Sequence, residues 1–281
     1  MAVRLAFLIY FLGVTFAYPA AAVSVSCLKC HRPHYETIDS CTGCHAGDAR
    51  TVRKEIAHLN LVPGRLVRYR IKGDPSADSG GKLLETFACR RCHKIDGKGN
   101  SLAPDLDRLG ARHPSRVLES ILRPVTYMPD FSFDPETASL LANAVVKTAA
   151  VSRHERREAP LIIRFNHSTQ HNDNVFEKHC GGCHRLLTES GALGKGNSGP
   201  NLSGLMGRYY PKTYAKMELW DQQRLAKWLK NPRASRPLSR MQPVIIDKRD
   251  FNHLLLILDA SNPRYLPPNS VKSRKISSMR S

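Results

Sequence analysis

Every cysteine of this chain lies in a Cys-x-x-Cys-His segment, and the segment occurs four times. The segments are 27–31, 41–45, 89–93 and 180–184. Two thiols separated by two residues can each form a thioether with one haem vinyl group, and the adjacent histidine then reaches the iron. Disulfides, zinc or redox exchange are other uses of paired cysteines, but none requires a histidine after every pair. The pattern predicts four haem c groups. The attachment residues are then Cys27, Cys30, Cys41, Cys44, Cys89, Cys92, Cys180 and Cys183, with His31, His45, His93 and His184 as proximal iron ligands.

The first residues are typical of a secretory signal peptide. Arg4 precedes an apolar run from Leu5 to Phe16, and small residues follow at Ala20–Ala22. We expect residues 1–22 to be removed on export, to the periplasm or to an outer-membrane-associated or extracellular location. No later segment is long and apolar enough to cross a bilayer, so we expect no transmembrane span in the mature chain.

The chain is strongly basic, with a formal net charge of +19. An exported protein rarely meets nucleic acid, and its Lys and Arg residues are spread along the chain rather than clustered, so nucleic-acid binding is not expected. The charge favours redox partners with acidic docking surfaces. Arg90, Arg91 and Lys94 flank the third segment, where they could face such a partner. Residues 263–281 are predicted to be a disordered basic tail.

Turn residues and spacing divide the mature chain into three units. Residues 23–75 hold two of the segments, and so short a stretch cannot bury a core without the porphyrins. A helix is expected there from Arg50 to Asn60. Residues 76–155 and 156–262 hold one segment each.

The second and third units share an internal repeat. Gly97–Ser101 recurs as Gly194–Ser198, and Ala103–Leu106 is matched by Gly199–Leu202. In both copies the pattern predicts a helix that ends before a proline, then a methionine near a proline, then a closing apolar helix. The expected helices are Ser115 to Arg123 and Pro135 to Lys147 in the second unit, and Asp221 to Asn231 and Asp250 to Asp259 in the third.

The order of these features resembles class I cytochrome c over residues 80–150 and again over 172–262. The resemblance implies that Met128 and Met241 ligate iron from the distal side. It also implies a mainly α fold with two tandem class I cytochrome c-like helical domains. A small dihaem module with little regular structure would precede them.

Residues 23–72 resemble the bis-histidine haem pairs of multihaem cytochromes. His34 is too close to His31 to cross to the other face of the first haem, but it can reach the second, and His58 is then the expected distal ligand of the first. A swapped pairing or an external ligand stays open. Residues 164–171 resemble a histidine segment of low-potential multihaem cytochromes, which makes His167 and His171 alternative distal ligands.

These ligands would leave no iron with an open position, so we expect an electron-transfer protein rather than an enzyme. A haem enzyme with one open iron is the alternative, similar to a dihaem peroxidase or an oxyanion reductase subunit. A structural part of a cytochrome conduit is a third reading. The mixture of units loosely resembles outer-membrane conduit cytochromes of metal- or oxyanion-reducing bacteria, which implies other multihaem cytochromes as partners and an outer-membrane or extracellular acceptor.

Overall fold

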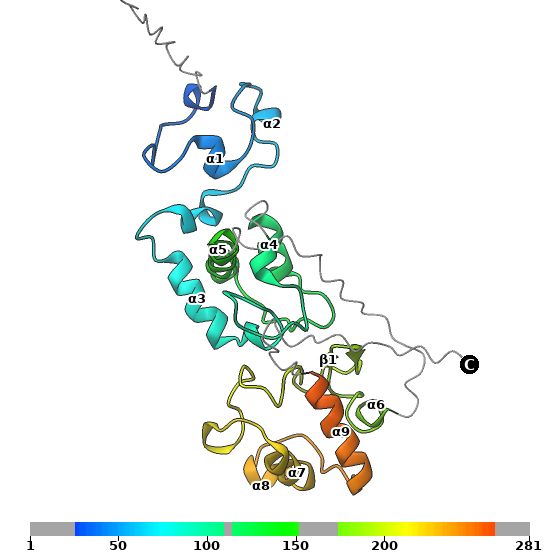
Figure 1. The fold of residues 1–281 in the computed structure, drawn as a ribbon. Coiled ribbons are helices and arrows are strands. Elements are labelled where there is room, and N and C mark those ends of the chain that lie inside the picture. Colours follow the sequence, from blue (N-terminus) through cyan, green and yellow to red (C-terminus); the bar gives the residue numbers. More distant parts are fainter. Residues whose placement is uncertain (1–25, 110–113, 152–173, 262–281) are drawn as a thin grey trace, which may run out of the picture.

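The computed structural model describes residues 26–109, 114–151 and 174–261. In this part of the chain the fold is mainly helical, with one short two-stranded sheet, as the sequence predicted at this coarse level. Three groups of elements follow one another along the chain (Figure 1). The helices are α1 (Cys41–His45), α2 (Lys54–Ala57), α3 (Ser76–Thr86), α4 (Pro114–Leu122), α5 (Pro135–Val151), α6 (Val175–His179), α7 (Gln222–Lys230), α8 (Pro232–Ser235) and α9 (Lys248–Ala260).

The first unit has little regular structure. The second Cys-x-x-Cys-His segment itself forms α1, and the Ser40 side chain caps it by accepting a hydrogen bond from the Gly43 N–H. The helix expected from Arg50 to Asn60 is only α2, four residues long. Val52, Ile56 and Leu59, which would form its apolar face, are all exposed, so there is no protein surface to stabilise a longer helix.

The second unit is built on α5, which packs against α3 and α4. Its buried residues include Leu141, Ala144 and Val145, which meet Leu84 of α3 and Ile95. Gly80 lets α3 approach closely, because a Cβ at this position would collide with the Leu140 carbonyl of α5.

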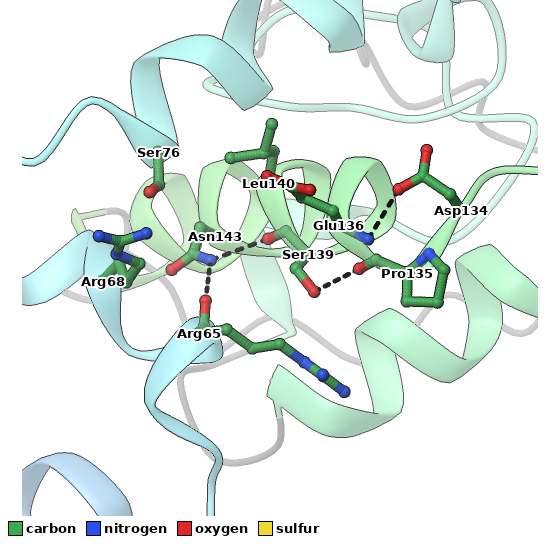
Figure 2. Close-up of a pocket in the computed structure, with 9 residues that line it drawn as sticks. All are labelled: Arg65, Arg68, Ser76, Asp134, Pro135, Glu136, Ser139, Leu140 and Asn143. Atoms are coloured by element: carbon green, nitrogen blue, oxygen red, sulfur yellow. Dashed lines mark hydrogen bonds between the residues drawn. The ribbon is translucent and has the colours of Figure 1, made fainter.

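The stretch after the first two segments packs on the second unit. Val62, Leu66 and Val67 share a buried cluster with Leu118 and Ala142. Figure 2 shows the adjoining open pocket, about 560 Å³ in volume, in which the Asn143 side chain donates to the carbonyls of Arg65 and Ser139. The first unit is thus attached to α5 by apolar and polar contacts.

The third unit surrounds a core formed by Phe176, Leu186, Leu229 and Leu258. Strands β1 (Leu186–Thr188) and β2 (Gly191–Leu193) pair antiparallel, with Leu186 opposite Leu193. Proline at position 232 ends α7 as predicted, and the chain turns at once into α8, which Asn231 caps.

Some predictions lie outside the described residues. They are the signal peptide, the basic tail, and the alternative ligands His167 and His171. Across 26–109, 114–151 and 174–261, none of the helices combines the length and apolar character that crossing a membrane requires.

Candidate functional site

The first two Cys-x-x-Cys-His segments line one cavity. Its volume is about 660 Å³, within the range of roughly 300–1,000 Å³ that is usual for ligand and cofactor sites. All four cysteines of these segments reach it, and so do four histidines: His31, His34, His45 and His58. The structure therefore gathers the predicted attachment and ligand residues of this unit around one space.

The four histidines form two pairs across this cavity. The ring centres of His31 and His58 are 5.9 Å apart, and those of His34 and His45 are 5.8 Å apart. The planes of the first pair are tilted by 49°, and those of the second are nearly perpendicular, at 81°. These are the two pairs that the sequence predicted, and ligation of iron by them stays a prediction.

Apolar side chains around the cavity are left unusually open. Leu28, Tyr35, Ile38, Val52 and Leu61 all line it and are all exposed. Exposed apolar groups that gather on one concave surface mark a place where an apolar ligand or partner binds. The surface suits an apolar ligand or partner.

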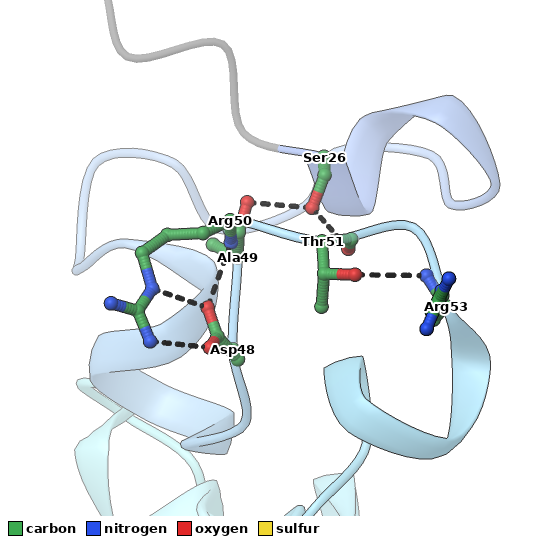
Figure 3. A network of polar contacts seen from close by, with 6 residues as sticks. All are labelled: Ser26, Asp48, Ala49, Arg50, Thr51 and Arg53. Carbon is green, nitrogen blue, oxygen red and sulfur yellow. Dashed lines mark hydrogen bonds and ion pairs between the residues drawn. The ribbon is translucent and has the colours of Figure 1, made fainter.

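Polar contacts fix the walls of this cavity. His45 Nδ1 lies 2.9 Å from the Val62 carbonyl oxygen, which orients the imidazole. Ser26 also lines the cavity, and its hydroxyl is 2.6 Å from the carbonyl oxygens of Ala49 and Thr51 (Figure 3). Asp48 pairs with Arg50 at 2.6 Å, and hydrogen bonds from Arg50 lower the pKa of Asp48 to about 2.

The histidines of the third and fourth segments make the same contacts to the loops that contain Pro104 and Pro200, as the sequence repeat predicts. His93 Nδ1 lies 2.8 Å from the Pro104 carbonyl oxygen, and His184 Nδ1 lies 2.8 Å from that of Pro200. The residue before each proline also makes an equivalent backbone hydrogen bond. The Ala103 N–H donates to the Cys92 carbonyl and the Gly199 N–H donates to the Cys183 carbonyl, both at 2.9 Å. The sequence repeat is therefore also a repeat of the hydrogen bonds around the histidine.

These bonds prepare both histidines to act as ligands. An Nδ1–H donated to a carbonyl leaves Nε2 with a free lone pair, and a carbonyl partner of this kind is usual for metal-binding histidine. Burial also lowers the pKa of His93, against the opposing effect of the Pro104 carbonyl, and so favours the neutral ring. At the fourth segment, Gly199 leaves room for the imidazole, because a Cβ there would collide with the His184 ring.

Three of the four cysteines of these two segments are partly or fully buried, and Cys183 is exposed. Cys92 is 7% exposed and packs against Leu187 and Ala192 of the third unit. Burial raises the pKa of Cys89 and of Cys180 to about 11 in each case. Among the described residues the cysteines form no disulfide.

The two methionines are half-buried in loops. Met128 follows the buried Tyr127, and its N–H donates to the Val125 carbonyl at 2.9 Å. Met241 packs against the core of the third unit, where Trp228 Nε1 lies 3.0 Å from its sulfur. The Met241 sulfur thus lies in a sheltered position beside the core of the third unit.

Two arginines expected to face a partner are engaged inside the chain. Arg90 Nε donates to the Ile95 carbonyl at 3.2 Å, and Arg91 Nη1 donates to the Asn201 carbonyl at 3.2 Å. Arg185 Nε, beside His184, is buried without a hydrogen-bond partner among the described residues, although Nη1 of the same side chain donates to Thr126. A buried guanidinium N–H without a partner is costly, and an acidic acceptor would satisfy it.

Sequence reasoning missed the carbonyls that orient the histidines. The repeat around Pro104 and Pro200 was visible, so the matching proline could have indicated two of them. Nothing in the sequence indicates Val62, because a backbone carbonyl carries no residue signature. Arg185 and Asn201 were likewise not singled out.

No family model, no curated protein and no solved structure matches this chain. The described residues also contain no group of three or more His, Cys, Asp and Glu side chains that could hold a metal ion. The predicted membership of the tetrahaem cytochromes is therefore wrong, with its class I domains, its dihaem module and its likeness to conduit cytochromes. The physical reason is that a five-residue motif and a short repeat record what a segment can bind, whereas family membership requires agreement along whole domains.

Proposed function

We propose that the chain is an exported electron carrier that holds four haem c groups, one on each Cys-x-x-Cys-His segment. This proposal rests on the segments themselves and on the first-unit cavity, and it does not depend on membership of any family. The observation that carries it is the cavity in which four thiols and two imidazole pairs meet.

The spacing of the imidazole pairs supports iron between them. A metal–imidazole bond is about 2 Å long and the ring centre lies about 1 Å beyond the nitrogen, so two rings on one ion have centres about 6 Å apart. The observed 5.9 and 5.8 Å agree with this value. His31 with His58, and His45 with His34, would then ligate the first and second irons. Because a porphyrin supplies the other four ligands, each iron needs only two protein groups.

The second and third units fit the same cofactor differently. His93 and His184 each have Nδ1 engaged and Nε2 available. Met128 and Met241 would supply the opposite ligands, and the unpaired Arg185 Nε is a suitable donor to a haem carboxylate. When bound, haem supplies a one-electron couple at iron.

Two protein ligands on every iron would leave no position for a substrate, which favours electron transfer as the function. The exposed apolar side chains of the first cavity would pack against bound haem, and the hydrogen bonds between backbone carbonyls and His45, His93 and His184 orient the imidazole rings. The basic surface favours rapid encounter with an acidic redox partner, in the periplasm or at the outer surface.

The proposal is tested by counting haems on the secreted chain. We expect four covalently bound haems per chain by mass and by haem absorbance, and one fewer in a Cys27→Ala/Cys30→Ala variant. The ferric spectrum should be low-spin throughout. A secreted chain with unmodified thiols would refute haem attachment, and a substantial high-spin fraction would refute the carrier in favour of an open iron.

A further inference from the structure

The loop that carries Met128 is held by the third unit. Arg185 Nη1 donates to the Thr126 carbonyl at 2.6 Å, and Asn201 Nδ2 donates to the Tyr127 carbonyl at 3.0 Å. In the other direction, the Tyr127 hydroxyl donates to the Gly194 carbonyl at 3.3 Å. The third unit thus donates hydrogen bonds to the carbonyls of residues 126 and 127, the two residues directly before Met128.

The two side chains that hold this loop, Arg185 and Asn201, each neighbour a residue of the His184 site. Arg185 follows His184 directly, and Asn201 follows Pro200, whose carbonyl oxygen lies 2.8 Å from His184 Nδ1. One short stretch therefore contacts the fourth proximal histidine through Pro200 and the Met128 loop through Asn201.

The third segment reaches the same junction. Arg91 Nη1 donates to the Asn201 carbonyl at 3.2 Å, and its guanidinium lies 5.4 Å from the centre of the Tyr210 ring. Cys92 and Tyr127 share a buried apolar cluster with Leu187 and Ala192. Both the attachment side of the third site and its methionine loop are therefore in contact with the third unit.

The repeat makes these contacts specific to one copy. Asn201 is equivalent to Asp105, and both accept a hydrogen bond from the N–H two residues on, from Ser203 and Asp107 respectively. Only the amide of Asn201 can also donate to a carbonyl, because an ionised carboxylate has no hydrogen to give. Arg185 is in turn equivalent to Lys94, which lacks the planar guanidinium. Met241, by contrast, is contacted by Trp228 within its own unit.

From these contacts we infer that Arg185 and Asn201 are positioning residues for Met128, so that the third iron site is completed by the following unit. The inference rests on the proposed function, since it takes Met128 as a ligand. Because Pro200 and Asn201 are adjacent, a movement of the Pro200 carbonyl that changes its hydrogen bond to His184 would also move the Asn201 side chain that holds the Met128 loop. The third and fourth sites are then coupled through the backbone.

The test uses the full haem-loaded chain with Asn201→Asp and Arg185→Lys, which install the residues of the other repeat copy. Both are made in a Met241→His background, so that the remaining absorption band of thioether-ligated ferric iron belongs to Met128. We expect both variants to lose a large part of this band and to lower the third haem potential, with all four haems retained. Tyr127→Phe, which removes only one hydroxyl, should give a smaller loss in the same direction.

The matched control is Arg208→Lys, because this arginine contacts the neighbouring Tyr209 in the same unit. It should leave the band and the potential unchanged. If Asn201→Asp and Arg185→Lys also leave both unchanged, the positioning role is refuted. Failure of the proposed function would look different, since the Met241→His parent would then show no haem or no thioether band at all.

Discussion

At the scale of single residues, Asn143 joins two parts of the chain. It is 1% exposed, and its side-chain oxygen accepts from the Tyr69 N–H at 3.0 Å. Its amide nitrogen donates to the carbonyls of Arg65 at 2.7 Å and Ser139 at 2.8 Å. All of its hydrogen-bonding groups are used, and two of the three partners belong to the chain leading out of the first unit.

Replacing Asn143 should therefore weaken the attachment of that stretch. Asn143→Ala removes the partner of the Tyr69 N–H and of the Arg65 carbonyl, which are part-buried; a fully buried group would lose about 1–3 kcal/mol, and these two lose less. We expect a loss of about 1–3 kcal/mol in the free energy of unfolding, measured by denaturant titration. Asn252→Ala, at an exposed position of α9, is the control and should change stability little. Equal effects at the two positions would contradict the role given to Asn143.

At the scale of elements, the contact between α3 and α5 depends on one of two neighbouring glycines. Gly80 faces the Leu140 carbonyl with no room for a Cβ, whereas a Cβ at Gly81 would meet nothing within 4 Å. Both glycines lie inside the same helix, so their intrinsic effect on helix stability is the same.

The two alanine substitutions should thus have opposite signs. Gly81→Ala should stabilise the chain by about 0.5–1 kcal/mol, because alanine loses less conformational freedom in a helix. Gly80→Ala should destabilise it by about 1–3 kcal/mol, because α3 and α5 must move apart. Thermal unfolding of both variants measures the difference, and a gain in stability from Gly80→Ala would show that the helices are not packed this closely.

The sequence was informative for elements that bury an apolar face. The expected helices at 115–123, 221–231 and 250–259 differ from α4, α7 and α9 by at most two residues at each end. It failed for the helix at 50–60, whose apolar residues face open space and not protein. The β1–β2 hairpin was also missed, because strands of three residues are too short to show an alternating pattern.

Within the candidate site, sequence reasoning indicated side chains but not the backbone around them. The pairs of His31 with His58 and His34 with His45 followed from spacing, since a nearby histidine cannot cross to the far face. Arg185 contacts Thr126, which lies 59 positions earlier in the chain, and Asn201 contacts Tyr127, which lies 74 positions earlier. No local sequence pattern predicts such contacts.

At the scale of the whole molecule, the proposed ligand sets would give electron flow along the chain a direction. Under the proposed function, the first unit has histidine on both faces of each iron, and the later units have histidine and methionine. Methionine raises the reduction potential of haem relative to a second histidine. Electrons would enter at the first unit and pass to the second and third.

This direction is tested by His58→Met on the full chain. We expect the lowest component of a potentiometric titration to move to higher potential, because a thioether favours reduced iron. Ile56→Met places the same side chain two residues earlier, at an exposed position of α2, the short helix that ends just before His58, and should leave the titration unchanged. If His58→Met moves the highest component instead, the proposed direction is reversed.

The open apolar wall of the first cavity links occupancy to solubility. Leu28, Tyr35, Ile38, Val52 and Leu61 are covered by no other part of the described chain, and the two helices beside them are only five and four residues long. A chain without a ligand in this cavity would expose these side chains as a hydrophobic patch that favours aggregation. Under the proposed function, chains that lack haem in the first unit would therefore aggregate more readily than haem-loaded chains.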